Sequence, residues 1–459
     1  MKKKFFLFFL FTPFFSHSQP LGTWKGYIKL SAKDSLALVL TIEKQEDSIS
    51  MELDSPDQYV FHKQATSSSY QNDTLAFAVK SWSASYSGAY SDEKQLINGV
   101  FTQYKQDFPL VLYKEEGRII PQRPQTPQPP FPYNIDEDIA YIENKIPVVR
   151  GTLTWPSDGK PKALVILISG SGWQDRDETM FLHKPFFVIA DYLTRQGYAV
   201  FRYDDLPPAK YRTTTTQDFA FYAGMIIDSL KNDERCIGIP IGLLGHSEGG
   251  LIAAMCASKR NDVEFIVSLA GVGIPLSDLL VYQAGIAAAQ AGFSETEIEP
   301  VKKMNVEFYQ LVKKSANQQK AVAAVDKWFH KTVSTMSNEE RERYQFTNNK
   351  LLEIKQLILN NWMYALIKYD PAVYLKKCKL PFLALNGNLD RQVESKPNLS
   401  AIEKNIPKNS HNRFIELPGL NHLFQTATTG YMNEYGQLEE TLSPEVLEIV
   451  KEWLEKVRR

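Results

Sequence analysis

A serine at the centre of a tight glycine turn constrains this chain more than any other feature. The Gly-His-Ser-Glu-Gly turn at 245–249 follows an apolar run at 239–244 and precedes the small-residue segment 250–255. This pattern predicts a buried strand, a sharp turn and a helix. Such a turn holds its serine at a strained backbone position, so that the hydroxyl projects from the sheet edge. The sequence therefore predicts an α/β fold with Ser247 as a nucleophile, and a glycine-rich turn without chemistry is the alternative.

A serine nucleophile needs a histidine base and an acidic residue that orients the base. In chains with this kind of turn, the acid and then the histidine follow the serine in sequence. Asp390 follows a buried-strand pattern at 380–385, and His422 follows a short strand pattern at 413–417. Both lie beyond the carboxyl ends of expected strands, where open α/β sheets place their sites. The sequence therefore predicts that Asp390 and His422 complete a triad with Ser247.

The other candidates fit this strand pattern less well. His411 and Asp370 precede their expected strands and belong to the opposite edge of the sheet. His246 lies inside the turn, where a packing role is the simpler interpretation. The remaining histidines lie in expected helices or in the N-terminal region: His183, His330, His62 and His17.

An oxyanion hole is expected between the serine turn and an earlier glycine-rich loop. Its first donor is the backbone N–H of Glu248, whose carboxylate also complements the dipole of the helix that it begins. The second donor comes from the loop 169–173, which follows the apolar run 163–168. Glycines there let the backbone approach a tetrahedral intermediate closely. We expect the N–H of Ser171 to be this donor, with Gly172 as the neighbouring alternative, and the side chain of Ser171 is not needed.

Three motifs together resemble a bacterial group of α/β-hydrolases. They are Gly-Ser-Gly-Trp-Gln-Asp-Arg-Asp-Glu at 170–178, the Gly-His-Ser-Glu-Gly-Gly turn, and Leu-Asn-Gly-Asn-Leu-Asp-Arg-Gln-Val at 385–393. Members look like short-chain carboxylesterases and are often grouped with serine aminopeptidase-type hydrolases. The resemblance covers roughly residue 138 to the C-terminus and implies the same triad. At 206–210 the chain reads Leu-Pro-Pro-Ala-Lys, where such enzymes usually have an Arg-Gly-x-Gly-like loop. The resemblance therefore implies the triad but not the shape of the pocket wall.

Charged residues in two segments have both a functional and a structural interpretation. Asp175, Arg176 and Asp177 could rim the pocket, but an ion-pair network that braces the loop is the preferred interpretation. The glutamates of Ser-Glu-Thr-Glu at 294–297 could capture a substrate amine. A capping box is preferred there, with the serine as N-cap and a glutamate three residues on.

Composition divides the chain into four segments. Residues 1–18 combine a basic start, a phenylalanine-rich run and small residues, which predicts a cleaved signal peptide. Residues 19–116 alternate apolar and polar positions and predict a small all-β barrel or sandwich. Residues 117–137 are rich in proline and predict an extended linker. Residues 138–459 predict an α/β-hydrolase fold, a mostly parallel doubly wound sheet with a helical cap at about 274–362.

The strands expected in the last segment are continuous apolar runs, which is typical of sheets buried on both faces. The expected parallel strands lie at 163–168, 198–203, 239–244, 264–269, 381–385 and 414–417. A hairpin is expected before them, with strands at 140–149 and 151–155.

Aromatic residues in two regions leave ligand binding open. Gly-Thr-Trp at 22–24 resembles the opening of lipocalin-like barrels. A ligand-binding barrel is one interpretation, and a tryptophan that closes one end of an ordinary β core is the preferred one. Four aromatic residues of the expected cap could line an acyl pocket, although packing between helices explains them equally well: Phe308, Tyr309, Trp328 and Phe329.

Charge and cysteine content argue against several functional classes. The formal net charge is −1 and falls to −4 without the three lysines of residues 1–18, so no basic nucleic-acid surface is expected. The odd, sparse set of Cys236, Cys256 and Cys378 argues against a disulfide framework. No metal-ligand spacing and no phosphate-binding glycine loop occur, so neither a metal nor a cofactor is expected. No later apolar run is long enough for a stable membrane anchor.

The sequence thus predicts an exported serine hydrolase, periplasmic or secreted, whose partner is a small-molecule carboxylic ester with a short acyl chain. Two alternatives stay open. One is peptide or amide hydrolysis by the same triad, as in an aminopeptidase. The other is a non-catalytic role in which the N-terminal β domain binds a ligand.

Overall fold

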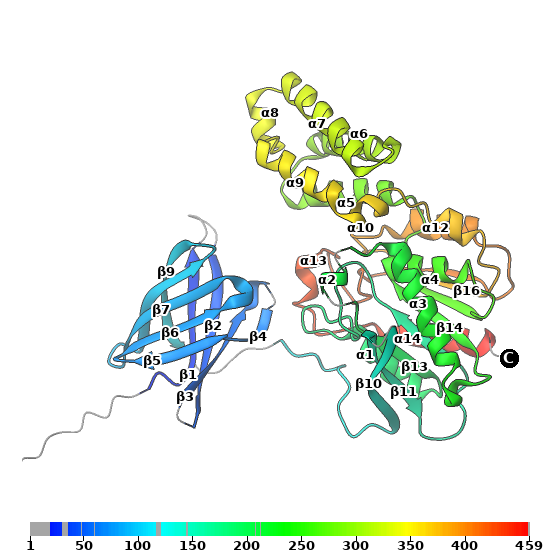
Figure 1. Cartoon of the computed structure of the whole chain (residues 1–459), viewed down its shortest axis with the longest axis horizontal. Helices are drawn as coiled ribbons and strands as arrows, with labels where there is room; N and C mark the ends of the chain where they lie inside the picture. Colours follow the sequence, from blue (N-terminus) through cyan, green and yellow to red (C-terminus); the bar gives the residue numbers. More distant parts are fainter. Residues whose placement is uncertain are drawn as a thin grey trace, which may run out of the picture. The chain divides into compact units, whose positions relative to one another are not determined.

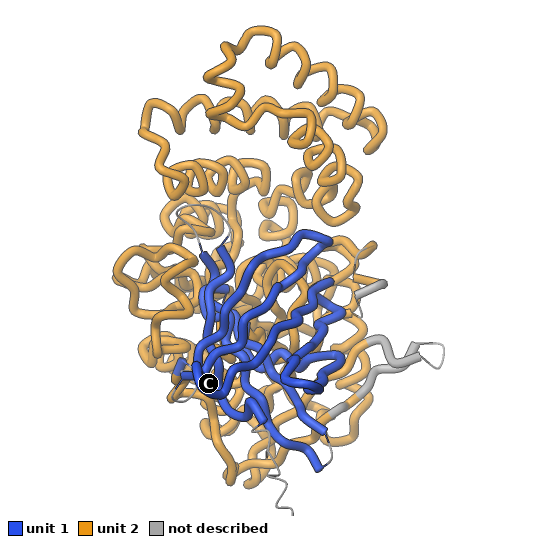
Figure 2. The backbone as a smooth tube through the Cα atoms, turned by 90° about the vertical axis from the view of Figure 1, so that its left-hand side faces the viewer, with its two compact units in different colours: residues 1–121 blue, residues 122–459 orange. Residues whose placement is uncertain are grey.

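A computed structural model describes residues 19–29, 35–46, 48–58, 60–115, 121–143, 146–206, 208–211 and 213–457. The signal peptide expected at 1–18 lies outside the described residues. The chain forms two compact units, residues 1–121 and residues 122–459 (Figure 2). Each unit contains a hydrophobic core of its own.

Unit 1 is a single curled antiparallel sheet whose strands follow in the order β4-β3-β2-β1-β9-β8-β7-β6-β5 (Figure 1). Its two ends approach each other where the Ser68 hydroxyl of β5 donates to the Ile49 carbonyl of β3 at 2.7 Å. Unit 1 is therefore a barrel-like sheet and not a sandwich of two sheets. Its strands are β1 (Gly22–Lys29), β2 (Ser35–Gln45), β3 (Ser48–Ser55), β4 (Val60–Gln64), β5 (Ser67–Gln71), β6 (Thr74–Val79), β7 (Ala84–Ser91), β8 (Leu96–Gln103) and β9 (Gln106–Glu115).

Trp24 lies inside the core of unit 1. Its side chain is fully buried, and its indole N–H donates to the Pro20 carbonyl at 2.8 Å. The ammonium group of Lys114 lies 4.5 Å from the centroid of the indole ring. The surrounding side chains come from alternate positions of the strands, including Leu40, Leu53, Leu75 and Leu112. Trp24 is thus a packing residue of an apolar core.

Much of the proline-rich segment expected as a linker at 117–137 belongs to unit 2. Residues 122–137 are part of that unit, and the strand β10 begins within them. The Arg123 guanidinium donates to the backbone carbonyls of Phe181 and Gly436, at 2.8 and 2.7 Å. Proline content predicted an extended backbone, but it carries no information on side chains that bind a neighbouring surface.

The sheet of unit 2 has the order β10-β11-β13-β12-β14-β15-β16-β17. β10, β11 and β13 pair antiparallel, and the pairs from β13 to β17 are parallel. The parallel strands begin and end within two residues of the expected positions. The strands are β10 (Tyr133–Glu143), β11 (Ile146–Pro156), β12 (Leu164–Ile168), β13 (Ala199–Tyr203), β14 (Ile241–His246), β15 (Phe265–Leu269), β16 (Phe382–Gly387) and β17 (Arg413–Leu417).

The expected break of the hairpin at Arg150 is wrong, because that residue lies within β11. Glycine at position 151 serves a close strand contact and not a turn. A Cβ on Gly151 would lie 2.4 Å from the Arg202 carbonyl oxygen of the neighbouring strand β13. A glycine within a strand pattern can mark such a close approach, and here it does.

Helices cover both faces of this sheet, because its buried strands present apolar residues on each side. Leu243 contributes to the core on one face and Leu244 to the core on the other, as strand alternation requires. The first core includes residues of α3 (Thr216–Lys231), α4 (Glu248–Ala257) and α12 (Ser395–Asn405). The second includes residues of α1 (Pro185–Arg195) and α14 (Pro444–Val457). The short helices are α2 (Pro208–Tyr211), α11 (Ala372–Leu375) and α13 (Met432–Tyr435).

The segment between β15 and β16 is helical and forms the cap, which projects beyond the sheet in Figure 1. It has a small core of its own, which includes Val312 and Val325. The capping box expected at 294–297 is confirmed, with Ser294 as N-cap of α6 and Glu297 as its partner. The cap helices are α5 (Leu276–Gln290), α6 (Glu295–Lys314), α7 (Gln318–Thr335), α8 (Asn338–Arg343), α9 (Asn348–Leu359) and α10 (Asn361–Leu366).

Two further observations concern membranes and cysteines. Across the described part of the chain, no helix has both the length and the apolar character needed to cross a membrane. The three cysteines are buried and unpaired: Cys236, Cys256 and Cys378.

Candidate active site

Ser247 lies at the sharp turn between β14 and α4. Its backbone has φ 56° and ψ −120°, in a region that side-chain-bearing residues seldom adopt. A Cβ on Gly245 would lie 2.1 Å from the Gly249 carbonyl oxygen, and a Cβ on Gly249 would lie 2.1 Å from that of Ile168. The Ser247 N–H donates to the Leu269 carbonyl at 2.8 Å. Only glycine therefore fits at positions 245 and 249 of this turn.

His422 and Asp390 form a buried hydrogen-bonded pair. His422 Nδ1 lies 2.7 Å from Asp390 Oδ2, and the two residues are 4% and 2% exposed. The other carboxylate oxygen accepts the backbone N–H groups of Gln392 and Val393, each at 2.8 Å. Asp390 is thus held in one orientation. With its Nδ1–H donated to Asp390, the His422 imidazole has Nε2 available as a base.

His422 packs against the serine turn. Its carbonyl accepts a hydrogen bond from His246 Nε2 at 3.0 Å, and the two imidazole centroids are 4.8 Å apart. Because His246 directly precedes Ser247, the candidate nucleophile and base belong to one packed cluster. Among the described residues, hydrogen bonds join His422 to Asp390 and to His246 but not to the Ser247 hydroxyl. Catalytic hydrogen bonds of this kind are often long in free enzymes and tighten when substrate binds.

Glu178 and His246 form a second buried pair, which the sequence did not reveal. Glu178 Oε1 lies 2.9 Å from His246 Nδ1 and accepts the Gly170 N–H at 2.8 Å. Burial lowers the pKa of His246, but the charge and hydrogen bond of Glu178, the hydrogen bond to the His422 carbonyl and the charge of Asp390 together outweigh burial, so this pKa lies above its ordinary value. With both ring nitrogens hydrogen-bonded, to Glu178 and to the His422 carbonyl, His246 connects the glycine-rich loop to the base. The only sequence signal for Glu178 was its place at the end of the 170–178 motif.

The glycine-rich loop lies directly beside the nucleophile. A Cβ on Gly170 would be 3.1 Å from the Cβ of Ser247. Because the Gly170 N–H is bound to a buried glutamate, Ser171 and Gly172 supply the next N–H groups of this loop. Glu248 is the first residue of α4, where a backbone N–H has no acceptor within the helix. Glu248, Ser171 and Gly172 therefore remain candidate donors to an oxyanion, although the Gly172 backbone also hydrogen-bonds to the Tyr211 side chain.

The carboxylate of Glu248 connects three parts of the fold. It accepts the hydroxyl groups of Ser171 and Thr216, both at 2.6 Å, and the indole N–H of Trp362 at 3.0 Å. Glu248 is only 3% exposed, so these bonds replace water around its charge. The Ser171 side chain, which was expected to have no role, therefore fixes the glycine-rich loop to the helix that begins after Ser247.

Asp205 is a partly buried carboxylate near this network. Burial raises its pKa to about 7, with help from the charges of Glu178 and Glu248 and against the hydrogen bond from the Gln174 N–H. Asp205 and Glu248 line a cavity of about 10 Å³, which is room for about one water molecule. Asp205 is therefore poised to change charge near neutral pH beside the glycine-rich loop.

Ion pairs brace the charged end of the 170–178 motif. Arg176 Nη2 lies 2.6 Å from Asp204 Oδ2, and Lys184 Nζ lies 3.3 Å from Asp177 Oδ2. The buried Arg202 guanidinium also bonds to Asp177, and burial lowers the pKa of Arg202 to about 10. These contacts agree with the preferred interpretation of this loop as an ion-pair network.

Nowhere in the described ranges do three histidine, cysteine, aspartate or glutamate side chains lie together in a group that could hold a metal ion.

Comparisons with known proteins extend this description. No curated protein matches the chain. Similar solved structures include dienelactone hydrolase from Anabaena variabilis, 15% identical over 71% of this chain and 98% of the other, with a TM-score of 0.39. Est1E from Butyrivibrio proteoclasticus is 14% identical over 70% and 99% of the two chains, with a TM-score of 0.41. Proline iminopeptidase from Mycobacterium smegmatis is 14% identical over 68% and 95%, with a TM-score of 0.38.

A family comparison gives a direct assignment. The sequence profile of the family described as serine aminopeptidase, S33, matches residues 159–426, a range that contains Ser247, Asp390 and His422. Because this match spans more than half of the 459 residues, the chain belongs to the serine aminopeptidase S33 family of α/β-hydrolases.

Proposed function

We propose that this protein is a serine hydrolase that cleaves carboxylic esters with short acyl chains through Ser247, His422 and Asp390. One observation carries the proposal: the buried His422–Asp390 pair, 2.7 Å apart, packs against a turn that holds Ser247 at φ 56°. A positive φ at a serine is a strained conformation, and strain of this kind is concentrated at functional sites. Membership of the S33 family supports a serine hydrolase, without distinguishing an ester from an amide substrate.

The proposed reaction proceeds in two halves. Ser247 Oγ attacks the ester carbonyl carbon while His422 Nε2 takes the hydroxyl proton, and Asp390 stabilises the resulting imidazolium. The backbone N–H groups of Glu248 and of Ser171 or Gly172 hold the oxyanion. His422 then returns the proton to the leaving alcohol, and an acyl-enzyme remains. A water molecule, deprotonated by His422, attacks this acyl-enzyme, and the acid leaves as Ser247 recovers its proton.

The surroundings of the nucleophile favour an ester over a substrate with a free amine. Capture of an amine needs a carboxylate that the substrate can reach. Glu178 is engaged by His246 and by a backbone N–H, and Glu248 is engaged by three donors. Asp205 faces a cavity with room for about one water molecule. These three carboxylates are therefore poor candidates for binding a substrate amine.

Amide hydrolysis is the second candidate function, and the family description supports it. A direct test compares p-nitrophenyl butyrate with alanine p-nitroanilide and N-acetylalanine p-nitroanilide on the purified protein. The proposal expects hydrolysis of the ester and little hydrolysis of either anilide, with Ser247→Ala as the inactive control. Efficient cleavage of alanine p-nitroanilide that is lost on N-acetylation would instead identify an aminopeptidase.

We also propose that the protein is exported, with cleavage between Ser18 and Gln19. Three lysines, a phenylalanine-rich run and small residues before the cleavage point support this address.

A further inference from the structure

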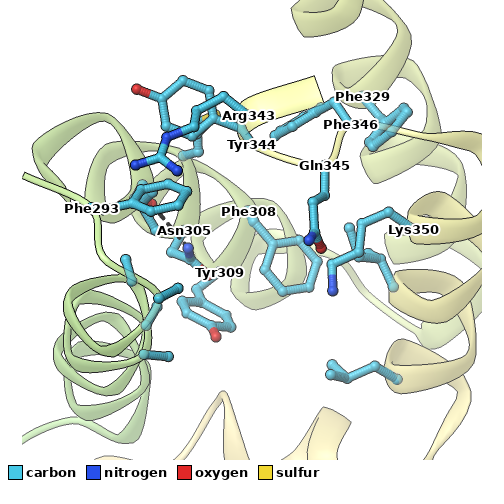
Figure 3. A pocket seen from close by; sticks show the side chains of 18 of the residues that line it. Phe293, Asn305, Phe308, Tyr309, Phe329, Arg343, Tyr344, Gln345, Phe346 and Lys350 are labelled. Carbon is cyan, nitrogen blue, oxygen red and sulfur yellow. Dashed lines mark hydrogen bonds between the residues drawn. The ribbon is translucent and has the colours of Figure 1, made fainter. Parts of the chain in front are cut away.

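The cap contains a cavity of about 440 Å³, whose volume lies within the roughly 300–1,000 Å³ of small-molecule sites (Figure 3). Aromatic side chains form much of its wall. All four aromatic residues that the sequence left between an acyl pocket and simple packing line this one cavity: Phe308, Tyr309, Trp328 and Phe329. They therefore do more than fill the space between helices.

The opposite wall of the cap cavity is a face of α5 made of small residues. Ala284, Ala287, Ala288 and Ala291 line the cavity and recur at helical spacing, so they share one face of the helix. Of these, Ala288 is buried, while Ala287 and Ala291 are exposed. Alanine on this face leaves open a volume that larger side chains would fill.

α5 separates the cap cavity from the catalytic residues. On another side of the helix, the Tyr282 hydroxyl donates to the Asp390 carbonyl at 3.4 Å. Tyr282 and Ala284 are two residues apart, which places them about 200° apart around the helix axis. Figure 1 likewise shows α5 between the sheet and the helices α6–α9. The cavity is thus a separate site within the cap.

Charged residues at the cap cavity favour an anionic group. Its lining includes Arg343 and Lys350 and no acidic residue. Figure 3 shows Arg343 beside Phe293 at one end and Lys350 at the other, with aromatic rings between them. The guanidinium carbon of Arg343 lies 3.9 Å from the Phe293 ring centroid. An apolar body bound among the rings can therefore place a charged end group beside either cation.

Arg343 has hydrogen-bonding capacity for such a group. Its Nε donates to Glu297 at 2.7 Å, and Nη2 donates to the Gly292 carbonyl at 3.3 Å. A guanidinium has five N–H donors, so a bound carboxylate can share this arginine with Glu297. Lys350 pairs with Glu353 at 3.1 Å, on an exposed surface where such a pair contributes little. Both cations are thus oriented by carboxylates that lie outside the cavity lining.

We propose that the cap cavity binds a monocarboxylic acid with an apolar chain, separately from the catalytic centre. The chain lies between the alanine face of α5 and the aromatic wall, and the carboxylate lies against Arg343. Apolar burial supplies affinity and the arginine selects the acid over a neutral molecule of the same shape. This binding does not depend on the proposed esterase activity, because a catalytically inactive variant should bind the acid equally well.

The test is calorimetric titration of the full-length Ser247→Ala protein with decanoate. We expect saturable binding, which Ala287→Trp in the same background should weaken at least tenfold because the indole fills the cavity. Gln290→Trp is the matched control, since it adds the same ring to an exposed position of α5 that does not line the cavity. Ala291→Trp serves as a second blocking variant if the first does not fold.

The role of Arg343 has its own comparison, between decanoate and decanol. Arg343→Gln should weaken the binding of decanoate roughly tenfold while decanol is little affected, as expected for the loss of a charged hydrogen bond. An equal loss for both molecules would overturn the assignment of the carboxylate to this arginine. Absence of saturable decanoate binding, or equal binding by the folded blocking variants and the control, would overturn the cavity as a ligand site.

Discussion

The indole N–H of Trp362 donates a hydrogen bond to the carboxylate of Glu248 across 3.0 Å. Trp362 belongs to α10, a helix of the cap, and Glu248 directly follows Ser247. The same carboxylate binds the Ser171 hydroxyl at 2.6 Å. One buried charge therefore fixes the cap and the glycine-rich loop to the helix that begins at the nucleophile, and Glu248 acts as a positioning residue.

Removing the indole N–H should disturb this arrangement without removing a reacting group. A hydrogen bond to a buried charge contributes about 1.5–3 kcal/mol, so Trp362→Phe should lower kcat for a short ester roughly tenfold or more. KM should change less, because the expected effect is on the oxyanion hole and not on substrate binding. Steady-state kinetics with p-nitrophenyl acetate measures both constants.

The cap offers a matched control for that variant. The Trp328 indole donates to Glu307 at 2.9 Å in an exposed position, so Trp328→Phe removes an equivalent bond remote from Ser247. This control should retain its kcat for the short ester. Equal kcat values for the two variants would contradict a positioning role for the Trp362–Glu248 bond.

Asp205 should make stability depend on pH. Its folded pKa of about 7 lies above the ordinary value of 3.8, so between these values the folded state holds a proton that the unfolded state releases. The stability from this group is complete below about pH 4 and is lost as pH rises to about 7. Between about pH 4 and pH 7, the free energy of unfolding of the wild type should fall by up to about 4 kcal/mol more than that of Asp205→Asn. Urea unfolding at several pH values measures the difference, and parallel curves for the two proteins would contradict it.

The stability of unit 2 without unit 1 should depend on the residue at which the truncated chain begins. A form that begins at Gln122 keeps the Arg123 contacts with Phe181 and Gly436, whereas a form that begins at Asn134 loses them. We expect the longer form to fold and to hydrolyse a short ester, and the shorter form to have a lower Tm. Differential scanning calorimetry and ester kinetics test both statements. Loss of activity in a folded Gln122 form would show that unit 1 completes the site.

Export makes a simple prediction about mass. Mature protein recovered from an export-competent bacterial host should begin at Gln19, because the basic and apolar segments before it are removed together. Intact-mass measurement distinguishes this form from the full chain. A recovered protein that keeps Lys2 would refute the proposed cleavage.

The sequence predicted the parts of the fold that follow from local pattern. Buried parallel strands are continuous apolar runs, so the strands around Ser247, Asp390 and His422 were located within two residues. The cap was recognisable because helical patterns replace strand patterns between β15 and β16. Each of these features can be predicted from the pattern within a single segment of the sequence.

The contacts that the sequence did not predict join segments far apart in the chain. Glu178 and His246 are 68 residues apart, and Glu248 and Trp362 are 114 apart. A glutamate on a surface and a glutamate in a buried network look alike in sequence, because burial is decided by packing. The expected break at Arg150 has a related cause, since Gly151 is required by a neighbouring strand that lies some fifty residues away in the chain.

Substitution of the proposed triad should abolish turnover. Ser247→Ala and His422→Ala should each lower kcat on the order of 10⁴-fold or more, because the three residues act as one unit. Asp390→Asn should cost about as much or somewhat less, since it disturbs the His422 tautomer. Near-normal ester hydrolysis by any of the three folded variants would exclude the assignment.

Covalent labelling tests the central claim most directly. The intact protein is treated with a fluorophosphonate, which reacts with an activated serine, and the modified peptide is identified by mass spectrometry. The account predicts one adduct on Ser247 that is absent from Ser247→Ala and much slower to form in His422→Ala. An adduct on another residue, or equal labelling of the Ser247→Ala protein, would contradict it.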